Sequence, residues 1–157
     1  MRWRGPSGVA DEAVFGAFDG LTAFEGVLLG LLAHPALVFT AAVGVGAANT
    51  VGMAAGQWLS DSDNGLGPAA VIGAFAGGAT IVPAMPFALG LPGWWARGVA
   101  AGLIAAVVGW IAWQRASMPR KGRRPGLRRA LAESYGVLAA AALVVAVCVH
   151  FTPGGSA

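Results

Sequence analysis

This chain has very few charged residues for its length. Only 11% of its 157 residues are Asp, Glu, Lys or Arg, and 57% are hydrophobic, whereas a soluble domain carries about a quarter charged residues. The shortage of charge and the long apolar runs exclude a water-soluble domain and indicate an integral membrane protein. A membrane β-barrel would instead show alternating segments of about ten residues. We therefore expect an all-α bundle, because helices pair their backbone polar groups internally.

Cysteine and histidine are also scarce. Cys148 is the one cysteine, so neither an intrachain disulfide nor a cysteine-rich zinc site can form. His34 and His150 fall near the ends of apolar runs and are interpreted as ordinary interfacial residues. The sequence contains no phosphate-binding loop, nucleophile elbow or HExxH motif, so it predicts neither an enzyme nor a tightly bound cofactor.

Five apolar runs are each close to the roughly 20 residues that a helix needs to cross the hydrocarbon core. Turn-forming residues separate these runs, including the polar SDSDNG and the LPG at 91–93. Pro83 and Pro86 remove backbone donors inside the third run and predict a break or kink there, which either lines a polar path or serves packing. We predict a single transmembrane domain over residues 1–157, with spans at about 13–33, 36–59, 67–91, 94–114 and 130–151.

Positive charge is concentrated between the last two runs. Seven of the ten basic residues lie between Arg115 and Arg129, and two more arginines precede the first run. The positive-inside rule then predicts a cytoplasmic N-terminus and cytoplasmic loops at 60–66 and 115–129. This pattern explains the net charge of +3 without a nucleic-acid partner. Glu133 is expected to pair with Arg129. Acidic residues interrupt the place of a signal-peptide apolar region, so we expect the N-terminus to be retained.

Small residues are abundant in the spans. The chain has 25 glycines, and GxxxG spacing, which lets helix backbones approach closely, recurs in four spans. With so many glycines no single pair identifies a dimer face, but tight helix packing is expected. The pairs are Gly26/Gly30, Gly52/Gly56, Gly73/Gly77 and Gly98/Gly102.

Two carboxylates lie within the first span. Asp19 and Glu25 flank Thr22 at three-residue steps, and an ionisable residue at membrane depth usually faces a bundle interior or a wet path. At 100° per residue, Asp19 and Glu25 point roughly 120° apart. They are therefore not expected to chelate one ion within one chain, although two facing copies of the helix could do so.

The second span carries Asn49, Met53 and Gln57 at four-residue steps. These side chains lie within roughly 80° of one another on a helix and form one stripe. Amide oxygens suit hard cations and a thioether suits softer ones, so a carboxylate facing this stripe fits a borderline ion such as Fe²⁺ or Mn²⁺. The alternative is that the amides join helices and Met53 fills a gap.

Three stretches together resemble the vacuolar iron transporter family, which includes the yeast calcium-cross-complementer-type transporters and nodulin-like proteins. FDGLTAFEGVLLGLLA has the family's Asp-Gly followed closely by a Thr. GMAAGQWLSD is similar to the end of the second span, and AFAGGATIVPAMPFAL to a Gly-rich segment that ends in Pro-x-x-Pro-aromatic. The matching positions are Asp19, Gly20, Thr22, Met53, Ala54, Ala55, Gly56, Ser60, Pro83, Pro86 and Phe87.

The resemblance covers nearly the whole chain and implies a homodimer with an ion path at or near its two-fold axis, lined by the first and second spans. It implies that Fe²⁺ or Mn²⁺ moves out of the cytosol in exchange for protons. By position, Asp19 would be the ion-binding carboxylate and Met53 a thioether ligand. The high content of Ala, Gly and Arg with a single Lys is typical of a GC-rich bacterium, so we expect the cytoplasmic membrane.

Two features depart from the family pattern. Gln57 stands where the family has a Glu, which removes a charge and a titrating group from a proton-coupled path, although Glu25 could compensate. The SDSDNG connector is also too short for the Glu-rich cytosolic domain that plant and yeast-type members place there, so the chain resembles a short form. Both departures favour an alternative function, that of a non-transporting scaffold subunit in a larger membrane complex.

Overall fold

The computed structural model describes residues 6–60, 66–117 and 126–151, and every element in these ranges is helical. Five helical segments are long and apolar enough to cross a membrane, which confirms the predicted all-α architecture. Four of them are single helices, and the third is a composite of two helices and a 3₁₀ turn. The single helices are α1 (Pro6–Gly30), α2 (Pro35–Ser60), α5 (Gly93–Ser117) and α6 (Leu127–Phe151).

The third segment breaks where the two prolines predicted it. α3 (Leu66–Ile81) gives way to the 3₁₀ helix η2 (Val82–Ala84) and then to the single turn α4 (Met85–Ala88). Pro83 and Pro86 occupy the first or second positions of η2 and α4, where a missing backbone donor does least harm. The segment ends at Gly90, whose φ of 66° is a left-handed conformation that glycine adopts without strain.

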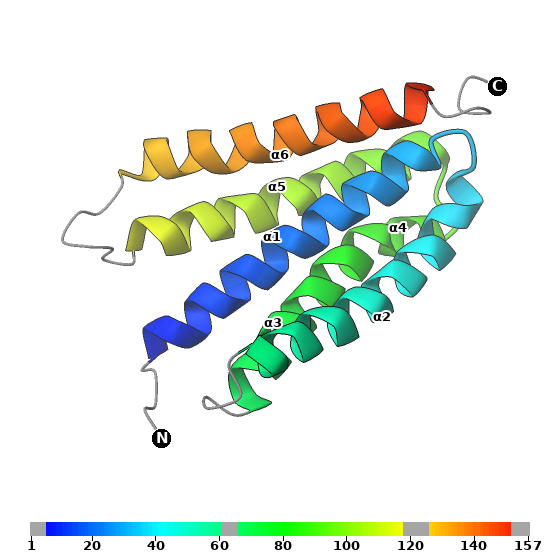
Figure 1. The fold of residues 1–157 in the computed structure, drawn as a ribbon. Coiled ribbons are helices and arrows are strands. Elements are labelled where there is room, and N and C mark those ends of the chain that lie inside the picture. The colour runs from blue at the N-terminus through cyan, green and yellow to red at the C-terminus, as the bar shows by residue number, and fades with distance from the viewer. Residues whose placement is uncertain (1–5, 61–65, 118–125, 152–157) are drawn as a thin grey trace.

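Successive long helices run in opposite directions (Figure 1). α1 and α6 therefore run the same way, with α5 antiparallel to both, and the start of α1 lies at the opposite end of the bundle from the end of α6. We call the end that holds the start of α1 the N-terminal end. The cytoplasmic placement of this end stays a prediction from the charge pattern.

Glycines on α1 and α3 let α3 pack closely against two neighbours. A methyl group at Gly20 would collide with the backbone carbonyl of Ala76, and one at Gly77 would collide with Thr50 on α2. Gly16 and Gly73 make similarly close approaches to α3 and α2, respectively. α1 and α2 thus pack on different faces of α3, as their arrangement in Figure 1 shows.

Of the predicted GxxxG pairs, Gly73/Gly77 is the one that packs between helices, because both of its members meet α2. The other three predicted pairs have nothing within 4 Å of the position that a Cβ would take. The sequence reasoning missed Gly16 and Gly20, which have the same four-residue spacing and could have been found by it.

The second half of the bundle is looser. α5 and α6 cover one side of α1 through a cluster of side chains that includes Leu21, Val108, Ile111 and Leu138. The most apolar window of the third segment is 50% buried within the chain, whereas the corresponding window of α6 is 11% buried. Most of α6 is therefore left for lipid or for another protein to cover.

Candidate functional site

Asp19 lines a pocket between α1, α5 and α6. The pocket has a volume of about 380 Å³, and Asp19 and Thr22 are both half-buried in its wall. The Thr22 hydroxyl donates a hydrogen bond to the Asp19 backbone carbonyl at 2.8 Å, a local bond that Thr commonly makes in membrane helices. The lining residues are Asp11, Val14, Phe15, Phe18, Asp19, Thr22, Ile111, Arg115, Ser134 and Val137.

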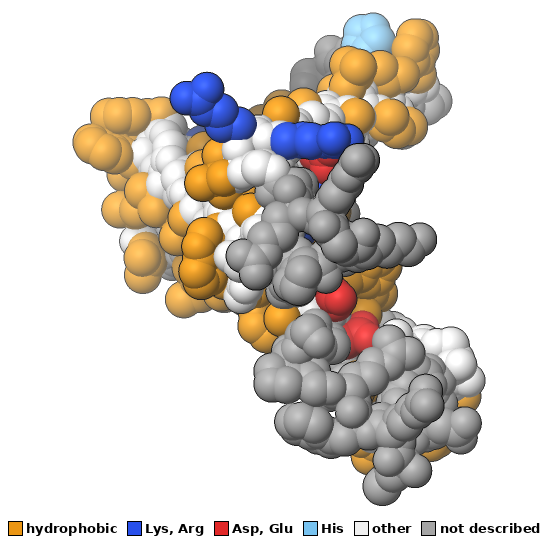
Figure 2. Space-filling view, turned by 90° about the vertical axis from the view of Figure 1, so that its left-hand side faces the viewer, with side chains coloured by type: hydrophobic (Ala, Val, Ile, Leu, Met, Phe, Trp, Pro, Cys, Tyr) orange, Lys and Arg blue, Asp and Glu red, His pale blue; other side chains and the backbone are white. Residues whose placement is uncertain are grey.

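The same pocket contains a cation that sequence reasoning did not place there. Arg115, in the last turn of α5, donates to Glu133 Oε2 at 2.9 Å and to Ser134 Oγ at 3.2 Å, both on α6. Glu133 Oε1 also accepts a 2.8 Å bond from Arg129, which confirms the predicted pair. Basic and acidic side chains meet at this end of the molecule, and hydrophobic side chains cover its flanks (Figure 2).

Glu25 lies outside this pocket, about a turn and a half further along α1. Its side chain is half-buried, and its Oε2 atom is buried with no hydrogen-bond partner among the described residues. Among the described residues, Glu25 therefore does not line the pocket that contains Asp19, in agreement with the roughly 120° between them on a helix. A buried polar atom without a partner is unusual enough in a native protein to need an explanation.

The predicted α2 stripe lies apart from the Asp19 pocket. Asn49, Met53 and Gln57 are each half-buried on α2, the helix that packs on α3 through Thr50 and its neighbours. The Asn49 Nδ2 atom is buried and, like Glu25 Oε2, has no hydrogen-bond partner in the described part of the chain. None of the three stripe residues lines the Asp19 pocket. A shared site for Asp19 and Met53 stays a prediction that a second copy of the chain would have to complete.

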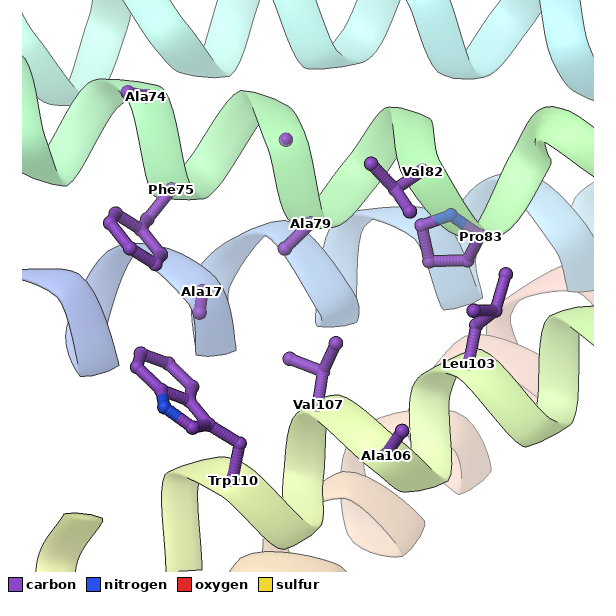
Figure 3. A pocket seen from close by; sticks show the side chains of 11 residues that line it. Ala17, Ala74, Phe75, Ala79, Val82, Pro83, Leu103, Ala106, Val107 and Trp110 are labelled. Atoms are coloured by element: carbon purple, nitrogen blue, oxygen red, sulfur yellow. The ribbon is translucent and has the colours of Figure 1, made fainter.

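A second pocket, of about 520 Å³, opens between α3, η2 and α5 (Figure 3). Its walls are apolar side chains from Ala17 on α1 to Trp110 on α5, and Pro83 lies at one end. Phe75 and Trp110 stack across the other end with their ring centroids 5.7 Å apart. The proline break therefore borders an apolar groove here and not a polar path, which favours the packing explanation of the break.

The described residues bring together few groups that could coordinate a metal ion. No three His, Cys, Asp or Glu side chains come together in a metal-sized cluster within the described ranges. Asp19 and Thr22 nevertheless supply a carboxylate and a hydroxyl oxygen at the wall of an open pocket, which suit a hard or borderline divalent ion.

Comparison of the chain with models of protein families, with curated proteins and with solved structures finds no match. The resemblance to the vacuolar iron transporter family therefore rests on the three stretches quoted above.

Proposed function

We propose that this protein is a membrane transporter that moves a divalent transition metal, Fe²⁺ or Mn²⁺, out of the cytosol. The observation that carries the proposal is the placement of Asp19, a half-buried carboxylate within a spanning helix and in the wall of an open pocket. Ionisable groups at such positions are costly and commonly mark ion pathways. The ion is the substrate, and no resident cofactor is needed.

The site groups divide into two sets in this proposal. Asp19 and Thr22 meet the ion from the pocket, and Glu25 relays charge or a proton deeper in the membrane. Asn49, Met53 and Gln57 join the path when a second copy forms a homodimer around a two-fold axis. The unpartnered atoms Glu25 Oε2 and Asn49 Nδ2 support this division, because each belongs to one of the predicted sites and lacks a partner in the described part of a single chain.

Exchange for protons is the proposed driving reaction, in the cytoplasmic membrane of a bacterium. Gln57 cannot titrate, so a carboxylate of α1 has to carry the proton. Glu25 is the better of the two, because it lies outside the pocket through which the metal ion reaches Asp19.

Flux through liposomes tests the proposal. Purified protein is reconstituted around an Mn²⁺-sensitive dye, and Mn²⁺ or Fe²⁺ entry is followed with and without a pH gradient. We expect uptake that is lost in Asp19→Asn, because the variant keeps the shape of the side chain but removes its charge. Glu12→Gln is the matched control, since it removes a carboxylate from the same helix outside the pocket lining, and it should retain flux.

A scaffold subunit is the alternative function, and the exposure of α6 favours it. A non-transporting subunit would use this uncovered face to bind another chain. Flux and co-purification measured on the same purified protein distinguish the two functions. Absence of flux from intact protein, together with stable co-purification of a second kind of chain, would reject the transporter, as would equal flux from wild type and Asp19→Asn.

A further inference from the structure

Arg115 is held to α6 by two hydrogen bonds. Its Nη2 donates to Glu133 Oε2 at 2.9 Å, and its Nη1 donates to Ser134 Oγ at 3.2 Å. The Ser134 side chain is buried, with 1% of the residue exposed, whereas the Arg115 side chain is 29% exposed. Glu133 is fixed in turn by Arg129, so α6 presents a positioned acceptor to the guanidinium.

Arg115 nevertheless lines the pocket that contains Asp19, but no ion pair joins the two residues in the described part of the chain. α1 and α5 are antiparallel, and Ile111 of α5 packs in one cluster with Leu21 of α1. Arg115 lies one helical turn beyond Ile111 toward the N-terminal end, so rotation of its long side chain would bring it toward Asp19.

A free guanidinium in this pocket would oppose cation binding in two ways. It would repel a divalent ion, and it would compete for the Asp19 carboxylate, since Arg and carboxylate form strong charge-assisted hydrogen bonds. Glu133 and Ser134 prevent both effects by occupying the Arg115 donors. Asp11 of α1 is the other carboxylate residue that lines the same pocket.

We propose that Arg115 is a positioning residue that sets the charge of the Asp19 pocket, and that Glu133 and Ser134 keep the pocket open to cations by holding Arg115 away from Asp19. Exposed ion pairs contribute little to stability on their own, so a purely structural explanation of the cluster predicts small effects from its removal. The transport consequence rests on the proposed function, but the binding of a divalent cation at Asp19 can be measured without transport.

The first test measures Mn²⁺ binding directly, without transport. Free Mn²⁺ gives an electron paramagnetic resonance signal that is lost on binding, so addition of Mn²⁺ to detergent-solubilised protein reports the affinity, and Asp19→Asn assigns the binding to this pocket. In Glu133→Gln, the released Arg115 should pair with Asp19 and weaken Mn²⁺ binding about tenfold. The double variant Arg115→Gln/Glu133→Gln should bind Mn²⁺ as the wild type does.

Three results would overturn the inference. They are a wild type in which Asp19→Asn removes no Mn²⁺ binding, an affinity that Glu133→Gln does not change, and a double variant that binds Mn²⁺ no more tightly than the single one. The last result would show that Glu133 acts through the fold and not through Arg115. Each variant is first checked for a single symmetric peak in size-exclusion chromatography, and Ser134→Ala provides a milder release of Arg115 if Glu133→Gln does not fold.

The second test uses Mn²⁺ flux. Glu133→Gln should lower flux about tenfold, as expected for one uncompensated charge beside the ion, and the double variant should recover most of it. A wild type without flux would reject the proposed function, while the Mn²⁺-binding experiment would still decide the inference. Flux that stays low in the double variant would overturn the inference itself.

Discussion

The two halves of this bundle are held together by different means. α1, α2 and α3 approach backbone to backbone, because glycines at four-residue spacing remove the side chains that would separate them. α5 and α6 are attached through larger side chains and leave two pockets along their borders with α1 and α3. In lipid, where apolar surface gives little drive for association, close packing of small residues stabilises a helix pair and looser borders leave room for ligands. The polar pocket that contains Asp19 lies at such a border.

The largest effect is expected on the free energy of unfolding, from a substitution that disturbs the close packing of α2 against α3. Gly77→Ala puts a methyl group into the Thr50 side chain and the Gly46 carbonyl, so we expect a loss of about 1–3 kcal/mol, typical of an overpacked interior. Gly78→Ala is the matched control on the next residue, because nothing lies within 4 Å of the added methyl. Thermal unfolding in detergent measures both. Equal destabilisation by the two substitutions would contradict the close approach of α2 and α3.

A smaller loss is expected at Thr80, which ties α3 to α1. Its hydroxyl is buried and lies 3.0 Å from the Gly20 carbonyl oxygen and 2.9 Å from that of Ala76. Thr80→Val keeps the shape and removes the hydroxyl, which should cost about 1 kcal/mol. Thr50→Val is the comparison, since the Thr50 hydroxyl bonds within its own helix to the Gly46 carbonyl. A larger loss of stability in Thr50→Val than in Thr80→Val would contradict a specific contribution of the hydrogen bond between α1 and α3.

A comparably small effect is expected across the apolar groove. Phe75 and Trp110 form the stacked contact between α3 and α5, and such a pair contributes about 0.5–1.5 kcal/mol beyond the area it buries. A double-mutant cycle with Phe75→Leu and Trp110→Leu isolates this coupling from the loss of each side chain. Additive effects of the two substitutions would show that the stack does not join the two halves.

The number and type of the helices could be predicted from the sequence, as could the break at Pro83 and Pro86 and the pairing of Arg129 with Glu133. Each depends on residues close together in the chain or on the composition of one run. The neighbours of Asp19 could not be predicted in this way. Arg115 and Ser134 come from other helices, and helical periodicity gives the face of a residue but not the helix that covers it.

Apolar length and the lack of charge were enough to assign this chain to the membrane, because the backbone in lipid has few alternatives to a helix. The same reasoning from neighbouring residues identified Asp19, Thr22 and Glu25 as polar groups whose position inside the membrane requires an explanation. Packing places Asp19 and Thr22 in the pocket and leaves Glu25 Oε2 buried without a partner among the described residues. Gly16 and Gly20 turn one face of α1 onto α3, so Asp19 lies on the border with α5 and α6. The residues that surround each carboxylate come from distant parts of the chain, because the glycines determine which helices can approach one another.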